Sequence, residues 1–157
     1  MDDVDLGLAW PIKRSFILYV ARMTEGQVLG GHGLRMLDAS TFLFPSHESA
    51  SDEVLAFDGE LRLAAHAGAL DLRIARPRVD LTAERAILLI DRPEGSGDPL
   101  PFVTFVLGPV VDAAGVHRLQ GSDVRLTVEA VPLFGGYYGE GESFDDLSIT
   151  MRPSRSS

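Results

Sequence analysis

The chain has 157 residues, 45% of them hydrophobic, which is enough for one domain with a core and too little for two domains of ordinary size. Its 23 acidic residues outnumber its 14 Lys and Arg residues, and the formal charge of -9 opposes binding to nucleic-acid phosphates or to an anionic membrane surface. The lack of cysteine excludes disulfides, thiolate zinc sites and iron–sulfur clusters, so any metal must be bound by oxygen or imidazole.

The N-terminal segment MDDVDLGLAW lacks the basic region and the long apolar run of a secretory signal, and no stretch of the chain reaches membrane-spanning length. The chain as given is therefore expected to be cytoplasmic, without membrane insertion. This expectation depends on Met1 being the natural start, because an excised domain of an extracellular or cell-surface protein would look the same. Residues 1–152 are expected to form a single domain and residues 153–157 a flexible tail.

The first predicted element is an amphipathic helix, because apolar side chains recur at helical spacing over residues 12–23. Pro11 suits the first helical position, and Gly26 suits a C-terminal stop. Tyr19 falls on the apolar face with Ser15 one turn before it, so a ligand lying along this face would meet both. Considered alone, Tyr19 is interpreted as a core residue with its hydroxyl at the rim.

After the helix the hydrophobic period changes to two. Short apolar segments bounded by Gly, Asp and Pro predict antiparallel strands at residues 41–45, 53–57, 60–66, 69–75, 79–83, 85–90, 101–108, 123–131 and 147–151. Asp58-Gly59 is predicted to be a hairpin turn, and Ala67-Gly68-Ala69 a weaker one. The expected fold is mostly β: an antiparallel β-sandwich-like domain with one N-terminal amphipathic helix and short additional helices.

His66 ends the predicted strand 60–66. Alternation puts the leucines of this strand on one face and His66 on the other, beside alanines small enough to let a flat group approach. Considered alone, a histidine at a strand end is more often hydrogen-bonded or solvated than a ligand. In a chain without cysteine, Tyr19 and His66 are nevertheless the best available pair for holding an iron centre.

The other histidines, His32, His47 and His117, lie in turn-like or loop-like sequence and lack the spacing of a zinc or non-haem iron site. They are interpreted as surface residues, with His32 kept as a distal neighbour of a bound ligand. The sequence contains no G-x-S-x-G elbow, P-loop, dinucleotide fingerprint or H-E-x-x-H motif. The adjacent Asp145 and Asp146 are typical of a solvated loop, so a hydrolase is not indicated.

Four segments resemble, in chain order, the Htaa haem-binding domain of actinobacterial haem-uptake proteins: LAWPIKRSFILYV, TFLFP, LAFDGELRLAAHAGALDLRIARPRVDL and VRLTVEAVPLFGGYYGEGESFDDLSIT. The resemblance covers nearly the whole chain. Its most specific parts are W-x-I-K-x-S-F-x-x-Y at residues 10–19, F-x-G…H-x-G-x-L-D at residues 57–71 and L-T…F…Y…G at residues 126–141.

The resemblance implies a mostly antiparallel β domain that holds one haem in a groove. In the family the tyrosine of the first helix binds the iron and a histidine donates a hydrogen bond to the phenolate. The matching positions here are Tyr19 and His66. Ser15 and Lys13, in the same helix motif, are then expected to contact a propionate or the haem edge. Apolar walls, or simply core, would come from Phe42, Phe44, Phe134 and Tyr138.

The chemistry of these groups agrees with the implied roles. A free phenol has a pKa of about 10, so the metal must displace its proton, and Fe³⁺ favours a hard anionic oxygen more than Fe²⁺ does. The site should therefore prefer ferric haem. A histidine that donates to the phenolate would orient it and set its basicity, and protonation or iron reduction would weaken the bond and release the ligand.

The expected function is haem transport, buffering or transfer, with a haem donor or acceptor protein as partner. Family members usually carry an export signal and often a membrane anchor, and the sequence shows neither. Two alternatives remain open. One is a haem-dependent enzyme, peroxidase-like or haem-degrading, since tyrosinate ligation also occurs in catalase. The other is a β-sandwich interaction module without a cofactor.

Overall fold

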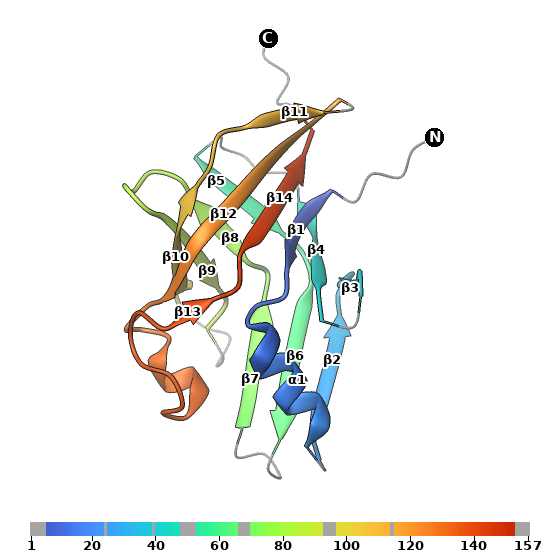
Figure 1. Ribbon diagram of the computed structural model, residues 1–157, viewed down its shortest axis with the longest axis vertical. Helices are drawn as coiled ribbons and strands as arrows, with labels where there is room; N and C mark the ends of the chain where they lie inside the picture. The colour runs from blue at the N-terminus through green and yellow to red at the C-terminus, as the bar shows by residue number, and fades with distance from the viewer. Residues whose placement is uncertain are drawn as a thin grey trace.

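The computed structural model describes residues 6–23, 25–38, 40–47, 53–65, 70–92, 97–113 and 115–152 (Figure 1). Its α-helix, α1, covers Arg14–Arg22, and a 3-10 helix, η2, covers Val131–Phe134. The strands are β1 (Gly7–Trp10), β2 (Gln27–Gly31), β3 (Arg35–Met36), β4 (Phe42–His47), β5 (Val54–Phe57), β6 (Glu60–Ala65), β7 (Leu70–Ala75), β8 (Arg78–Asp80), β9 (Ala86–Ile90), β10 (Leu100–Leu107), β11 (Val111–Ala113), β12 (Val116–Leu126), β13 (Ser143–Phe144) and β14 (Leu147–Met151).

Most strands belong to one antiparallel sheet that closes on itself. Its order is β1-β14-β12-β10-β9-β8-β5-β4, and β4 pairs again with β1, so that eight strands form a ring within the described residues. β3 extends from β4, while β11 and β13 pair with β12. Closure satisfies the hydrogen-bonding groups that open sheet edges would expose. The expected mostly β, antiparallel fold with a helix near the N-terminus is confirmed.

A smaller antiparallel sheet, in the order β2-β6-β7, continues from the ring at one end of the molecule (Figure 1). Leu61, Leu63 and Ala65 of β6 are buried while Arg62 is exposed, so the predicted alternation is confirmed for the described part of this strand. α1 packs against β2 and β6 and covers this apolar face. Within the described residues, no helix has the length and apolar character needed to cross a membrane.

The helix begins later than predicted. Pro11 is not its first residue: α1 starts at Arg14, and the extended Lys13 precedes it as N-cap. The reason is Ile12, which is completely buried and has a φ of 63°, a left-handed conformation that is rare for a β-branched residue. The chain turns sharply here, and the Ile12 carbonyl accepts a hydrogen bond of 3.0 Å from the Asp145 amide. The end of β1 is thereby fixed to the β13–β14 segment before the helix starts.

Asp58-Gly59 was predicted as a hairpin turn, and that prediction is wrong. β5 pairs with β4 and β8, whereas β6 pairs with β2 and β7, so the two strands around this dipeptide belong to different sheets. Gly59 has a φ of 107°, which a glycine adopts without strain, and it lets the chain cross from the ring to the small sheet. The pairing of β6 with β7 agrees with the second predicted hairpin, but Ala67-Gly68-Ala69 lies outside the described residues.

Several strands do not appear in the predicted pattern. The missed strands are short, glycine-rich or mixed in polarity, so they lack a clear period of two. They are β1, β2, β3, β11, β13 and the first half of β12. In the opposite direction, the predicted strand 123–131 is too long, because β12 ends at Leu126 and the chain turns into η2. The turn packs Phe134 into an aromatic cluster with Phe16, Phe102 and Phe144 at centroid distances of 5.3, 6.0 and 5.6 Å.

Candidate functional site

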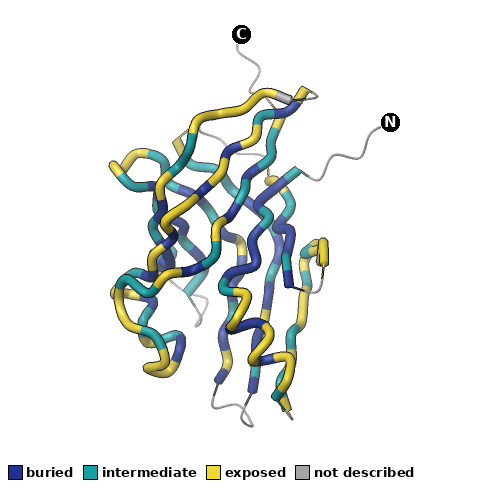
Figure 2. The backbone as a smooth tube through the Cα atoms, in the orientation of Figure 1, coloured by how far each residue is buried: buried dark blue, intermediate teal, exposed yellow. Residues whose placement is uncertain are grey.

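α1 presents Tyr19 at the surface. Phe16, Ile17 and Val20 face the small sheet and are buried, whereas 45% of Tyr19 is exposed. The tyrosine therefore lies at the edge of the buried stripe, outside the hydrophobic core. Figure 2 shows exposed positions along the outer side of α1 and around the loop that follows η2.

The loop after η2 brings two more phenols to α1. Tyr138 is half-buried, with its ring 5.9 Å from that of Phe16 and 5.4 Å from that of Phe134, both edge-on. Tyr137 is 61% exposed, and its side chain shares a hydrogen bond with Tyr19. This hydrogen bond, followed by a smaller desolvation effect, raises the pKa of Tyr19 above that of a free phenol. The three phenols, which are far apart in the sequence, are thus neighbours in the fold.

The environment of Tyr138 also favours the neutral phenol. Burial raises the pKa of Tyr138, and the charges of Glu142 and Tyr19 raise it further. A phenolate at Tyr138 would lie among apolar rings and beside a carboxylate. Of the two phenols, Tyr19 is the better placed to meet a metal, because it is more exposed and lies outside the aromatic cluster.

Lys13 is occupied by contacts within the chain. Its ammonium donates a hydrogen bond of 2.8 Å to the Ser143 carbonyl, lies 3.2 Å from Glu142, and sits over the rings of Tyr138 and Phe144. Only 16% of its side chain is exposed. Lys13 therefore fastens the start of α1 to the loop after η2, and a ligand would have to break these contacts to reach it.

Ser15 and Arg22 extend the exposed face of α1 around Tyr19. Ser15 lies four residues before Tyr19 and Arg22 three residues after it, the spacings that bring side chains together on one face of a helix. Both are exposed. The sequence analysis named Ser15 but not Arg22. The spacing of three residues from Tyr19 could have indicated that Arg22 lies on the same helix face.

His66 lies outside the described residues, as do its immediate neighbours 67–69. What the structure does show is where β6 ends. Gln27, at the start of β2, pairs with Ala64, so the strand that follows α1 begins beside the last residues of β6. The C-terminal end of α1 and the end of β6 at Ala65 therefore lie at the same end of the small sheet.

His32 lies at the opposite end of that sheet, just after Gly31, which pairs with Glu60. Its side chain is 76% exposed, and its imidazole lies 3.7 Å from the Glu60 carboxylate. It lines a cavity of about 460 Å³ with Asp58, Arg73 and Asp91, among others, and Tyr19 is not part of that lining. The structure therefore does not bring His32 to Tyr19.

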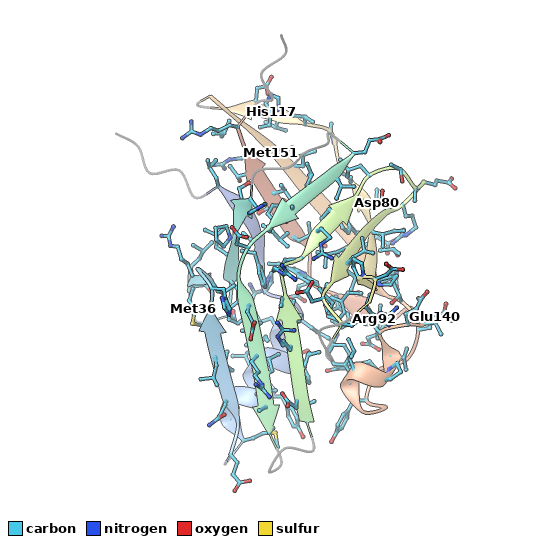
Figure 3. The ribbon with its side chains drawn as sticks, turned by 180° about the vertical axis from the view of Figure 1, so that it is seen from behind. Met36, Asp80, Arg92, His117, Glu140 and Met151 are labelled. Atoms are coloured by element: carbon cyan, nitrogen blue, oxygen red, sulfur yellow. The ribbon has the colours of Figure 1, made fainter. Side chains whose placement is uncertain are left out.

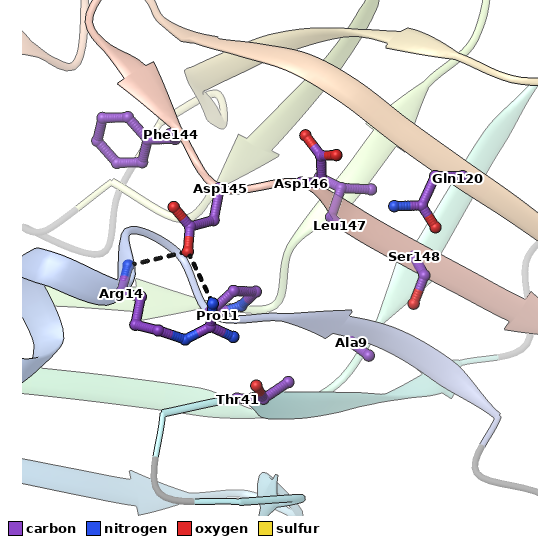
Figure 4. Close-up of a pocket in the computed structure, with 10 residues that line it drawn as sticks. All are labelled: Ala9, Pro11, Arg14, Thr41, Gln120, Phe144, Asp145, Asp146, Leu147 and Ser148. Carbon is purple, nitrogen blue, oxygen red and sulfur yellow. Dashed lines mark hydrogen bonds and ion pairs between the residues drawn. The ribbon is translucent and has the colours of Figure 1, made fainter.

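A second cavity, of about 590 Å³, lies between β1 and the β13–β14 segment (Figure 4). Its main polar contact joins Arg14 to Asp145: the Arg14 amide donates a hydrogen bond of 3.2 Å to the carboxylate, and the guanidinium lies 3.7 Å from it. Tyr19 does not line this cavity either. Tyr19 is therefore separate from both of these cavities.

His47 and His117 each pair with a nearby carboxylate. His47 is 3.1 Å from Asp58, and His117 is 2.8 Å from Asp112. Figure 3 shows His117 at the end of the ring opposite the small sheet. Among the described residues, no group of three or more His, Asp or Glu side chains could hold a metal ion.

Phe42, Phe44 and Phe134 are completely buried. Phe42 and Phe44 belong to β4, which faces the interior of the ring, and Phe134 belongs to the aromatic cluster. Of the aromatic residues considered as walls for a ligand, Tyr138 is the one that reaches the surface in part. The fully buried phenylalanines pack the core.

The closed sheet, the small sheet that continues from it and the helix packed on that sheet define an antiparallel β domain of two joined sheets. The family model described as Htaa matches residues 5–150, and the chain belongs to the Htaa family. No curated protein sequence matches it.

Solved structures show the same fold. The C-terminal domain of HtaA from Corynebacterium glutamicum is 20% identical, with a TM-score of 0.72 over 94% of this chain and 97% of that domain. The heme binding protein HtaB from the same organism is 17% identical, with a TM-score of 0.73 over 92% of this chain and 91% of that one. A domain-swapped dimer of a histidine-to-alanine variant of the HtaA domain is 20% identical, with a TM-score of 0.66 over 88% and 90%.

Proposed function

We propose that the chain binds ferric haem, with Tyr19 as a phenolate axial ligand. The observation that carries this proposal is the position of Tyr19: its ring stands 45% exposed on α1, at the edge of the buried stripe. Membership of the Htaa family and the likeness to HtaB, a heme binding protein, support haem as the ligand.

The residues around Tyr19 fit haem better than a free metal ion. A single phenol cannot hold a small cation alone, and no cluster of three metal-binding side chains occurs in the described residues. Haem brings its own four nitrogen ligands and needs one axial donor from the protein. The exposed apolar surface of Leu18, Tyr19 and Tyr137 suits a flat aromatic ligand.

The raised pKa of Tyr19 sets a requirement on binding. The phenol is protonated at neutral pH, so ligation must expel a proton and break the hydrogen bond with Tyr137. Ferric iron offsets this cost better than ferrous iron, because a hard anionic oxygen binds the higher charge more strongly. We therefore propose that the site prefers oxidised haem and releases it on reduction or acidification.

His66 and Ser15 complete the proposed site. We propose that His66 supports the Tyr19 phenolate by donating a hydrogen bond, as a group that orients a metal ligand. The end of β6 at Ala65, one residue before His66, lies at the end of the small sheet to which α1 leads. Ser15, exposed one turn before Tyr19, is proposed to contact the edge of the haem.

We propose a role in haem transport, buffering or transfer to a partner protein, in preference to catalysis. The enzymatic alternative was suggested by tyrosinate ligation in catalase, and His32 is the histidine considered as a distal group for it. His32 lies at the other end of the small sheet and is already next to Glu60. A haem that is bound at the surface through one axial oxygen can be transferred to another protein without unfolding the hydrophobic core.

The decisive experiment titrates hemin into the protein and into Tyr19→Phe, which keeps the ring and removes the oxygen. The wild type should give a sharpened Soret band with phenolate-to-iron charge-transfer features, and Tyr19→Phe should lose the latter and bind far more weakly. His117→Ala, at the far end of the ring, serves as the matched control and should match the wild type. An unchanged spectrum for Tyr19→Phe would show that another residue binds the iron.

The alternative without a cofactor is tested by melting temperature. A ligand that binds only the folded state stabilises it by mass action, so hemin should raise the melting temperature of the wild type. No shift and no colour with hemin would favour an interaction module.

A further inference from the structure

The cations of this acidic protein are mostly neutralised within the chain. Most described cations lie within ion-pair distance of a carboxylate: Lys13, Arg14, Arg62, Arg73, Arg76, Arg78, Arg85 and Arg125. Arg92 donates to the Asp98 carbonyl. Arg22 differs, because within the same residues it has neither an ion pair nor a hydrogen bond from its side chain, and it is exposed.

Arg22 lies on the same face of α1 as Tyr19. It follows Tyr19 by three residues, so its Cα lies about 4.5 Å further along the helix axis and on the same face. Ile17 and Val20 are buried toward the small sheet, and the buried Phe16, three residues before Tyr19, borders this face. A flat ligand whose centre is bound at Tyr19 would therefore extend its edge toward either Ser15 or Arg22.

Haem carries two propionates on one edge, and their carboxylates favour a guanidinium over a hydroxyl. Lys13, the other cation near this face, is already bound to Ser143 and Glu142. Arg22 is thus the cation of α1 that a propionate can reach without breaking a contact with another described residue. The net charge of -9 makes such a partner more important, since the protein as a whole repels the two negative charges of the propionates.

We infer that Arg22 binds a propionate of the haem, so that the acidic edge of the porphyrin lies toward the C-terminal end of α1. This inference rests on the proposed function and deepens it, because it selects carboxylate-bearing porphyrins as ligands and fixes their orientation. A structural role also exists for Arg22, since a cation in the last turn of a helix stabilises the helix dipole. The experiment must separate the two roles.

The experiment measures the affinity of four proteins for hemin and for iron protoporphyrin dimethyl ester, in which both carboxylates are neutral, in the same solvent mixture. The proteins are the wild type, Arg22→Gln, Arg22→Lys and Arg118→Gln. Arg118 is an exposed arginine of β12 that also lacks a side-chain partner in the described residues, so it controls for the loss of one positive charge. Melting temperatures without ligand report the contribution to the helix.

Arg22→Gln should bind hemin about 3- to 10-fold more weakly than the wild type, as expected for a charged contact at a surface. It should bind the diester as the wild type does. Arg22→Lys should recover part of the affinity for hemin, and Arg118→Gln should leave both affinities unchanged. The difference between wild type and Arg22→Gln should shrink at high salt, because the contact is screened.

Three results would overturn the inference while leaving the proposed function intact: equal hemin affinity for wild type and Arg22→Gln, an equal loss with both porphyrins, or an equal loss in Arg118→Gln. A lower melting temperature for Arg22→Gln with unchanged affinity would assign the residue to helix stability and also overturn it. If the wild type binds neither porphyrin, the proposed function itself fails, and the inference fails with it.

Discussion

The phenol of Tyr19 on α1 donates a hydrogen bond to Tyr137 on the loop after η2, and this contact is the main cause of the raised pKa of Tyr19. The loop thereby makes the proton of Tyr19 harder to remove than that of a free phenol. The proposed binding of iron at Tyr19 would remove the same proton, so iron and Tyr137 would compete for the Tyr19 hydroxyl.

Tyr137→Phe removes the acceptor and should move the pKa of Tyr19 down toward its ordinary value. Because the proton then leaves more easily, ferric haem should bind at lower pH than it does to the wild type. Absorption titration of the phenols, together with hemin affinity across pH, measures both effects. Tyr138→Phe is the matched control, since Tyr138 is not the hydrogen-bond partner of Tyr19, and it should leave the pH curve of hemin binding close to the wild-type curve. If both variants shift this curve equally, the effect belongs to the loop as a whole.

Phe134 is expected to stabilise the fold without taking part in ligand binding. Its ring is completely buried and packs edge-on against Phe16, Tyr138 and Phe144. Phe134→Ala should lower the free energy of unfolding by about 3–5 kcal/mol, because it removes a large apolar group and leaves a cavity. Denaturant unfolding measures this loss. Phe134→Leu, which fills more of the space, should lose less, and a loss below about 1 kcal/mol for the alanine variant would contradict the packing.

Gly26 allows the chain to pass close to the end of α1. A Cβ built on Gly26 would lie 1.8 Å from the Val20 carbonyl oxygen, a backbone atom that cannot move aside. Gly26→Ala should therefore cost about 1–3 kcal/mol of stability, as overpacking does, and should disturb the helix that carries Tyr19. Gly31→Ala is the matched control, since a Cβ there meets nothing within 4 Å. Equal melting temperatures for the two variants would refute the close approach.

Asp91 should make stability depend on pH. Burial alone would raise the pKa of Asp91, but hydrogen bonds of 2.8 Å from Arg76 and from Arg78 outweigh it and lower the pKa. A carboxyl group with a lowered pKa in the folded state contributes stability above its unfolded pKa of about 3.9, and this contribution is lost as the pH falls through the folded value. Asp91→Asn should thus cost about 1–3 kcal/mol at neutral pH.

The same measurement at acidic pH provides the check. The free energies of unfolding of wild type and Asp91→Asn should converge as the pH falls below about 4, because the wild-type carboxylate becomes protonated. Asp146→Asn is the control, since Asp146 is exposed and has no ion pair in the described residues. A constant difference between Asp91→Asn and wild type at every pH would mean that shape, not charge, carries the effect.

The sequence alone determined those features that depend on the spacing of neighbouring side chains. The apolar stripe over residues 16–20 predicts α1, and the alternation in residues 60–65 predicts which face of β6 is buried. The position of Tyr19 on that helix follows from the same period. Its exposure did not follow, because periodicity placed Tyr19 on the apolar face, whereas the structure leaves it 45% exposed at the edge of the buried stripe.

Only the tertiary structure decided which distant segments meet. The Asp58-Gly59 dipeptide has the composition of a hairpin turn, yet β5 pairs with β4 and β8. In this position β5 closes the ring, so the hydrogen-bonding groups on both of its edges are paired. Lys13 was predicted to contact a ligand, and only the structure showed that it contacts Glu142 and the carbonyl of Ser143. The contact of Tyr137 with Tyr19, and the lack of an ion pair for Arg22 among the described residues, became visible in the same way. Contacts across more than a hundred residues depend on how the sheets close, and no local period encodes that closure.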